Sequence, residues 1–250
     1  MDETHIEEKG MVYELTNFKV KFFLPYLYMD TIQKTIFLDD NFYEAANLNK
    51  IFGLLDGNIA KAVRQKDGMV LDIGANIGNH AIYFADVIGA TKVTCFEAVP
   101  ETYRILKKNI TLNKLDDRIA TYCNGISDTD EKFPPPVYEY ENTGGTSLVS
   151  ESEDKCKINA DFFEEEDMIS CRSIDSYNFS NVSLIKIDVE GMELKALRGA
   201  EKTIGLFKPY IIIESYPNKF EGICKFLKNM NYSYNVINEN CYDYLFYPNE

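Results

Sequence analysis

The chain has 250 residues, of which 45% are hydrophobic and 13% aromatic, enough to bury one sizeable core. Its formal net charge of −14 at pH 7, without a cluster of basic residues, disfavours nucleic acid and membranes as partners. No apolar stretch is long enough to span a bilayer, and the first ten residues are polar, so we expect a cytoplasmic protein.

The first 68 residues are expected to form an N-terminal cap on a larger domain that covers residues 69–250. Residues 13–24 and 32–38 have strand-like patterns, and residues 42–65 have a helical one. The cap should therefore combine strands with a helix and lie near the mouth of the main sheet.

Residues 69–250 alternate between strands and helices. We expect strands at residues 69–74, 92–97, 119–125, 182–191 and 208–216, helices at residues 78–89, 100–113, 192–204 and 220–230, and two strands within residues 232–248. Near-continuous Val, Ile and Leu in the strands predicts a mostly parallel sheet covered on both faces. The sequence thus predicts a three-layer α/β fold.

A long excursion, residues 129–172, interrupts this alternation. It contains PPP, the stretch NTGGTSL and the acidic run FFEEED. Connections of this length are typical of functional lids or disordered linkers, and we expect this one to shape the binding site. The acidic run is interpreted as a solvated face.

The turn in VLDIGANIGNH, residues 70–80, is the first candidate binding element. Ligands of parallel sheets bind beyond the carboxyl ends of the strands, which is where this turn lies. A dinucleotide-binding turn needs Gly-x-Gly-x-x-Gly, but Asn76 and Asn79 occupy the second and third glycine positions. A pyrophosphate would meet side chains there, which disfavours a nicotinamide-dependent oxidoreductase.

Carboxylates near this turn suit a different ligand. Glu97 ends the second strand, where it can accept two hydrogen bonds from a ribose diol, and Asp72 lies just under the turn. Two carboxylates, amide donors at a helix start and no basic residue suit a cationic, zwitterionic nucleoside better than a polyanion. S-adenosylmethionine fits this description, with S-adenosylhomocysteine as the product.

Several motifs of the chain resemble those of one known protein family. LDIGANIGNH, CFEAVPETYRILKKNITLN, NGISD, GGTSL, IKIDVEG, KPYIIIE and YDYLF occur in the order seen in FkbM-type methyltransferases. The chain resembles this family from about Asn41 to the C-terminus, and IKIDVEG is the most specific motif. The resemblance implies a Rossmann-like seven-stranded sheet with an antiparallel C-terminal hairpin, S-adenosylmethionine as methyl donor, and commonly a hydroxyl acceptor on a sugar or natural-product scaffold.

The resemblance also implies a donor site at the carboxyl edge of the sheet. Asp72, Gly74, Asn76 and Gly78 would hold the methionine part of the donor, and Glu97 its ribose. Displacement at a sulfonium-activated carbon needs mainly collinear positioning, so these contacts contribute much of what the reaction requires.

Other implied roles leave a structural alternative open. Ser127 and Asp128 would flank the adenine, although a loop aspartate often satisfies its own backbone. Asp188 and Glu190 would face the sulfonium and the acceptor. Glu44 could reach the donor from the cap, although a glutamate on a surface helix is the ordinary interpretation.

An alcohol acceptor benefits from a base that removes its proton as the new bond forms. The catalytic candidates are Glu190, Asp188 and His80, with Glu214 a further carboxylate on the substrate side. Histidine is the side chain that titrates nearest neutrality, but at a helix start it can also be purely structural.

The remaining candidates belong to the acceptor side. Lys186 interrupts a buried strand and shares a face with Asp188, which indicates either a structural ion pair or a cation for an alkoxide or anionic substrate. Thr146 and Ser147 offer hydroxyls suited to a polyol, unless NTGGTSL is only a turn. No metal is predicted, although the carboxylates could form an oxygen site for magnesium.

Three functions stay open. We expect an S-adenosylmethionine-dependent methyltransferase acting on a hydroxyl, or less readily an amide nitrogen, of a small acceptor. The family resemblance narrows that acceptor to a sugar or a nucleotide sugar used in surface polysaccharide biosynthesis. The alternatives are a nicotinamide-dependent oxidoreductase and a catalytically inactive binding or scaffold protein on the same fold.

Overall fold

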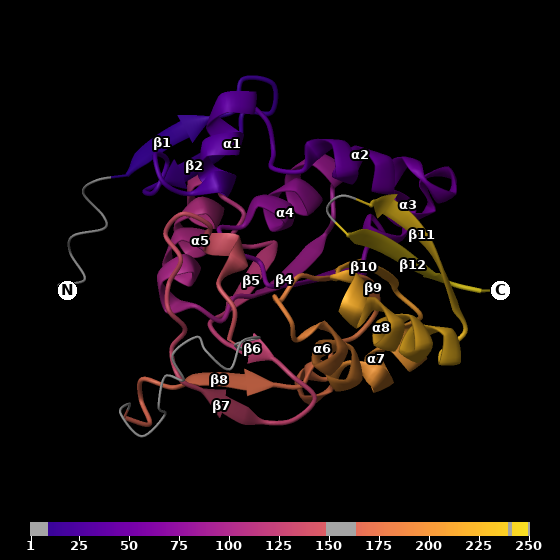
Figure 1. The fold of residues 1–250 in the computed structure, drawn as a ribbon. Coiled ribbons are helices and arrows are strands. Elements are labelled where there is room, and N and C mark those ends of the chain that lie inside the picture. Colours follow the sequence, from indigo (N-terminus) through magenta and orange to yellow (C-terminus); the bar gives the residue numbers. More distant parts are fainter. Residues whose placement is uncertain (1–9, 149–163, 240–241, 250) are drawn as a thin grey trace.

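The computed structural model describes residues 10–148, 164–239 and 242–249, with a seven-stranded sheet at its centre (Figure 1). Its strands are β3 (Met69–Ile73), β4 (Lys92–Phe96), β5 (Ile119–Tyr122), β9 (Val182–Ile187), β10 (Tyr210–Glu214), β11 (Tyr232–Asn238) and β12 (Asp243–Pro248). They lie in the order β11-β12-β10-β9-β3-β4-β5. The neighbouring strands β10, β9, β3, β4 and β5 run parallel, and β12 is antiparallel to both β10 and β11. The predicted α/β class, the mostly parallel sheet and the C-terminal hairpin are confirmed.

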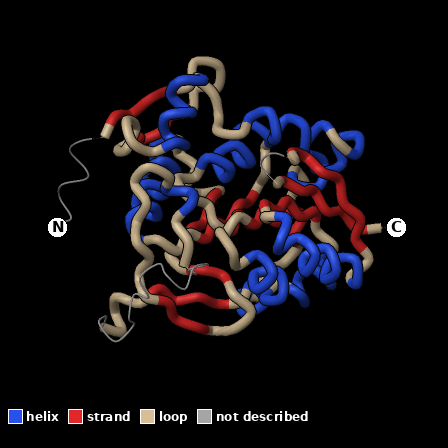
Figure 2. The backbone as a smooth tube through the Cα atoms, viewed as in Figure 1, coloured by secondary structure: helices blue, strands red, loops and turns tan. Residues whose placement is uncertain are grey.

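Helices cover both faces of this sheet (Figure 2). They are α2 (Ala45–Gly53), α3 (Asn58–Val63), α4 (Asn79–Ile82) with its π-helical continuation (Tyr83–Ile88), and α5 (Pro100–Leu112) on one face, and α6 (Glu193–Gly199), α7 (Glu201–Phe207) and α8 (Pro217–Asn229) on the other. Successive strand residues point to opposite faces, so Val70 joins the hydrophobic cluster of the first group and Leu71 that of the second. The result is the predicted three-layer arrangement.

Among the element boundaries that differ from the prediction, two have a clear local cause. The helix predicted at residues 192–204 is divided into α6 and α7, because the Asp175 carboxylate accepts the N–H groups of Lys202 and Thr203, each at 2.9 Å, and so starts a new helix. The strand predicted at residues 182–191 ends at Ile187, because Glu190 and Gly191 have φ of 44° and 107°.

The N-terminal cap shares a hydrophobic cluster with the sheet. β1 (Met11–Glu14) and β2 (Lys21–Leu24) form an antiparallel hairpin, which is followed by α1 (Thr31–Asp39). The strand predicted at residues 32–38 is wrong: Asp30 caps a helix there by accepting the N–H of Gln33, and the buried Ile32 and Ile36 have helical spacing. The helix predicted at residues 42–65 is interrupted by the 3₁₀ turn Leu55–Gly57, whose residues have positive φ.

The excursion after β5 adds a small sheet below the main one (Figure 1). β6 (Gly125–Ile126) pairs in parallel with β8 (Ile169–Arg172), which pairs antiparallel with β7 (Glu131–Phe133); 3₁₀ turns form at Thr143–Gly145 and Ile174–Tyr177. Residues 164–167 of the acidic run are exposed, as predicted, and its first two residues lie outside the described part. Within the described segments, no helix has the length and apolarity needed to cross a membrane.

Candidate active site

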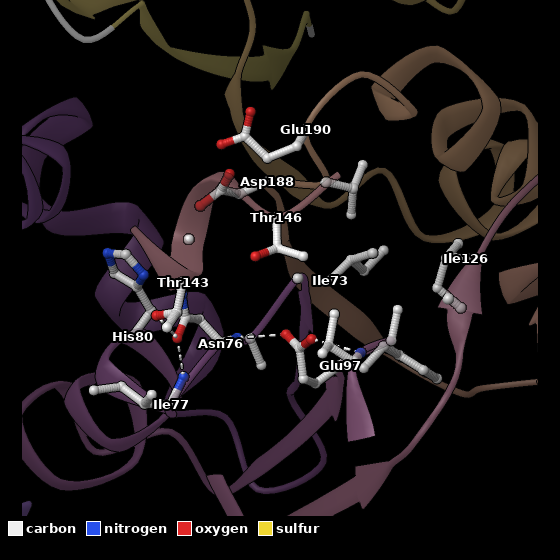
Figure 3. A pocket seen from close by; sticks show the side chains of 18 of the residues that line it. Ile73, Asn76, Ile77, His80, Glu97, Ile126, Thr143, Thr146, Asp188 and Glu190 are labelled. Atoms are coloured by element: carbon white, nitrogen blue, oxygen red, sulfur yellow. Dashed lines mark hydrogen bonds between the residues drawn. The ribbon is translucent and has the colours of Figure 1, made fainter. Parts of the chain in front are cut away.

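A cavity opens at the carboxyl edge of the sheet, beside the turn from β3 to α4 (Figure 3). It encloses about 880 Å³ of empty space, counting the part open to solvent. Its walls come from the ends of β3, β4, β6 and β9, from α1 and α4, and from the loop around Thr143–Gly145. The sheet, the cap and the excursion thus meet at this cavity.

The glycine turn forms the floor of the cavity. Gly74 has φ of 80°, and a Cβ there would lie 1.7 Å from the carbonyl oxygen of Asp188, so only glycine fits beside β9. Asn76 also has a positive φ, 48°, and its N–H donates to Glu97 at 2.9 Å. Gly78, with φ of 91°, is the N-cap of α4. The structure therefore brings Gly74 and Asn76 to the cavity, as predicted, while Gly78 starts the helix behind it.

Glu97 is the best-defined polar group of the cavity. It is 7% exposed, and its two oxygens accept N–H groups from Asn76 and Val99, each at 2.9 Å (Figure 3). Burial raises the pKa of Glu97 to about 7, against the lowering effect of these two donors. Each carboxylate oxygen keeps a further lone pair, so Glu97 can still accept hydrogen bonds from a ligand diol.

Asp188 and Glu190 project from the segment after β9 along the opposite wall (Figure 3). Nζ of Lys186, 6% exposed, lies 2.9 Å from Oδ2 of Asp188, so the ion pair suggested by their spacing is present. Burial alone would lower the pKa of Lys186, but the charges of Asp188 and Asp72 raise it above its ordinary value. Burial and the neighbouring Asp188 and Glu193 carboxylates raise the pKa of Glu190 to about 7.

Like Gly78, three other residues expected to contact the donor do not line this cavity: Asp72, Ser127 and Asp128. Asp72 is fully buried beside Lys186 in the sheet, and neither of its carboxylate oxygens has a hydrogen-bond partner among the described residues. Ser127 and Asp128 are drawn away because the N–H of Ser127 joins the small sheet by donating to the Arg172 carbonyl, at 3.0 Å. The preceding residues, 124–126, reach the cavity in their place.

His80 lies where the main cavity meets a second, smaller one under α2. This second cavity, which we call the rear cavity, is lined by Glu44, Asn47, Leu48, Ile51, His80, Phe84, Lys186, Ile212, Glu214 and Asp243. Glu44 and Glu214 face this space and do not line the main cavity, contrary to their expected contacts with donor and substrate there.

Three carboxylates crowd the rear cavity. Glu44, Glu214 and Asp243 each place an oxygen within 4.8 Å of the others. Burial and the charges of Asp188 and Asp243 raise the pKa of Glu214 to about 9, and burial and the charge of Glu44 raise that of Asp243 to about 7. Glu214 therefore holds a proton at neutral pH.

The roof of the main cavity is a loop held at both ends. Asp30, fully buried, accepts from the N–H of Thr143 at 2.8 Å and from its hydroxyl at 2.9 Å. Ser147 donates its hydroxyl to the carbonyl oxygen of Glu190 at 2.6 Å, so it fixes the loop and does not line the cavity. Thr146 lines the cavity, and its predicted contact with an acceptor stays a prediction.

Several residues of the site lacked a recognisable sequence signal. Tyr43 lines the cavity and is joined by two hydrogen bonds to Asn79 of the predicted turn, and Asp30 holds the roof of the cavity. Asp243 could have been noticed as one acidic residue in the aromatic, apolar strand YDYLF. The partners of Tyr43 and Asp30 are too distant in the chain for any spacing rule to find.

Comparison with known proteins agrees with this geometry. A family model described as the Methyltransferase FkbM domain matches residues 72–234. The chain is 23% identical over 171 residues to methyltransferase sdnD of Sordaria araneosa, covering 59% of this chain and 66% of that protein. It is 26% identical over 149 residues to methyltransferase 1 of Beauveria bassiana (strain ARSEF 2860), covering 54% of this chain and 59% of that protein.

The chain therefore spans less than two thirds of the length of these curated relatives. Among solved structures, methyltransferase FkbM from Methylobacillus flagellatus KT is similar in fold, with a TM-score of 0.52 and 19% identity over 72% of this chain and 43% of that one. The family match extends over more than half of the chain and includes the glycine turn, Glu97 and the IKIDVEG motif. The chain belongs to the FkbM methyltransferase family.

Proposed function

We propose that the protein is an S-adenosylmethionine-dependent methyltransferase that methylates a hydroxyl group of a small acceptor. The observation that carries this proposal is Glu97, a buried carboxylate held by two backbone N–H groups at the edge of a cavity floored by a glycine turn. A carboxylate at this place in a parallel sheet is suited to a ribose diol.

The rest of the cavity suits the remaining parts of this donor. Apolar side chains of Phe96, Ile126 and Leu148 offer a surface for a purine, and the carboxyl groups of Asp188 and Glu190 would face the sulfonium and ammonium groups of the donor. When bound, S-adenosylmethionine supplies a methyl carbon activated by its sulfonium. The chain's own residues would orient the donor and the acceptor and remove the hydroxyl proton.

A nicotinamide-dependent oxidoreductase fits the cavity less well. Of the described residues that line it, only Lys186 and His80 can carry positive charge, and each is already paired with a carboxylate. A pyrophosphate would therefore find no free cation, and Asn76 stands where its close approach to the backbone needs glycine.

The residues expected to face the acceptor favour a neutral sugar over a nucleotide sugar. Thr146 offers a hydroxyl to the main cavity, which suits a polyol. Beside it, a shallow hollow is lined by Asp188, Glu190, Glu193 and Glu214 together with Ser215, Tyr216 and Tyr242. A diphosphate would meet carboxyl groups and no basic residue among these lining residues, so we infer that the remainder of a neutral or amine-bearing acceptor extends here from the main cavity, in keeping with the polysaccharide role that the family resemblance implies.

Donor binding can be tested before the acceptor is known. Calorimetry with S-adenosylhomocysteine should show binding to the wild type and a loss of about 10- to 100-fold in affinity for Glu97→Ala, the effect of losing hydrogen bonds to a charged group. Glu201→Ala, at an exposed position of α7, is the matched control and should bind normally. Absence of binding to the wild type would favour the scaffold alternative.

Methyl transfer is then measured with methyl-labelled S-adenosylmethionine and a fractionated extract of the source cell. Label in a small-molecule fraction, lost with Glu97→Ala, supports a small hydroxylated acceptor. Label confined to polymer, lipid or protein would contradict the small acceptor, while still supporting methyl transfer.

A further inference from the structure

Glu44 has an unusual conformation at the start of α2. It occupies the N-cap position with φ of 58° and ψ of 26°, in the left-handed region, and its side chain makes no capping hydrogen bond. A non-glycine residue in this region is energetically costly, and an N-cap side chain that does not cap the helix forgoes a common source of stability. Some other contact must therefore hold the Glu44 side chain.

That contact is a hydrogen bond with His80. Nε2 of His80 lies 3.2 Å from Oε2 of Glu44, and the two side chains are only 11% and 17% exposed. The residues just before Glu44 and His80 also bond to each other. Tyr43 N–H donates to Asn79 Oδ1 at 2.9 Å, and Asn79 Nδ2 donates to the Tyr43 carbonyl at 3.1 Å. Two consecutive cap residues are thus fastened to the first two residues of α4.

The surrounding charges keep Glu44 ionised. Burial by itself would raise the pKa of Glu44, but the hydrogen bond and charge of His80, with the charge of Lys186, bring it below its ordinary value. The other titratable groups around the rear cavity and beneath it are Asp72 on β3, Asp188 after β9, Glu214 on β10 and Asp243 on β12. An ionised Glu44 accepts and cannot donate, so the proton of a neutral His80 is placed on Nε2.

We infer that Glu44 is a positioning residue that holds His80 as the base for the acceptor hydroxyl, with the lone pair of Nδ1 available to the main cavity. His80 lines that cavity, and no hydrogen bond ties Nδ1 to another described residue. In the step itself, the acceptor oxygen forms a bond to the methyl carbon, the C–S bond breaks with its electrons on sulfur, and the hydroxyl proton passes to Nδ1. The Glu44 carboxylate then stabilises the imidazolium that results. This inference rests on the proposed function.

The two histidines of the chain make the pairing directly observable. Nitrogen-15 NMR above the titration range of imidazole distinguishes a protonated ring nitrogen from a bare one, and His80→Gln identifies which signals belong to His80. In the wild type, His80 should be protonated at Nε2 and bare at Nδ1. In Glu44→Gln, whose amide can donate to Nε2, the form protonated at Nδ1 should become populated, whereas Glu201→Gln should not change the signals.

Catalysis is measured as transfer of label into the acceptor-containing fraction of the extract at saturating S-adenosylmethionine. Glu44→Gln and His80→Gln should each lower this rate by about 10²- to 10⁴-fold, the usual contribution of a general base, with S-adenosylhomocysteine affinity kept within about threefold. Glu44→Asp, which keeps the charge on a shorter side chain, should recover part of the rate. Thermal melts accompany each variant, and Glu44→Asp provides the comparison if His80→Gln fails to fold.

The outcomes separate this inference from the proposed function. If the wild type binds S-adenosylhomocysteine and Glu44→Gln transfers methyl groups at the wild-type rate, the role of Glu44 is overturned. Protonation of His80 at Nδ1 in the wild type would overturn it as well. No binding of S-adenosylhomocysteine to the wild type would overturn the proposed function and, with it, the catalytic role of the pair. A lowered rate together with the altered NMR signals supports both.

Discussion

Asp30 offers a direct test of how the cap contributes to donor binding. Its buried carboxylate accepts three hydrogen bonds, from the N–H and hydroxyl of Thr143 and from the N–H of Gln33. Asp30→Ala removes the N-cap hydrogen bond of α1, which stabilises the fold by about 1 kcal/mol. It also removes two hydrogen bonds from Thr143 to a charged acceptor, each of which contributes about 1.5–3 kcal/mol. We expect the free energy of unfolding to fall by about 4–7 kcal/mol, the sum of these contributions, with part of the loss confined to the roof of the cavity.

If the roof contacts the donor, the same change should weaken S-adenosylhomocysteine binding by about 10-fold or more. Calorimetry at a temperature where the variant is still folded by circular dichroism measures this effect. Asp30→Asn keeps a capping oxygen and should lose less, and Thr143→Val removes only the hydroxyl bond. Equal affinity for Asp30→Ala and the wild type would refute a role of the roof in donor binding.

Three further predictions concern buried groups of the site. Lys186→Met removes the partner of Asp188 at 2.9 Å and leaves carboxylates buried without a cation, so denaturant unfolding should show a loss of about 3–5 kcal/mol; an unchanged midpoint would disprove the structural role of the pair. Because the folded state raises the pKa of Glu214 from 4.5 to about 9, folding favours its protonated form, and its contribution to stability declines as the pH rises through this interval. Glu214→Gln should therefore raise the melting temperature at pH 8 and have little effect at pH 4; a larger rise at pH 4 than at pH 8 would contradict this prediction. Gly74→Ala would place Cβ 1.7 Å from the Asp188 carbonyl, so thermal melts should show severe destabilisation, and normal stability would show that the turn can move.

The sequence alone determined the central sheet and part of the main cavity. Apolar runs separated by helical periodicity predict parallel strands, and residues that follow those strands must meet at one edge, which brought Gly74, Asn76 and Glu97 together. The Lys186–Asp188 pair was predictable for a similar reason, since residues two apart in a strand share a face. Each of these inferences needs only local geometry and the order of the elements.

Tertiary structure alone decided which side chains complete the site. Residues 32–38 alternate like a strand yet form a helix, because Asp30 caps it and Ile36 is buried on its inner face. Tyr43 meets Asn79 across 36 residues and Asp30 meets Thr143 across 113, and no spacing rule encodes such pairs. Ser127 and Asp128 are carried away from the cavity by the pairing of the small sheet. Contacts of this kind depend on how the cap and the excursion pack against the sheet, which is a property of the whole fold.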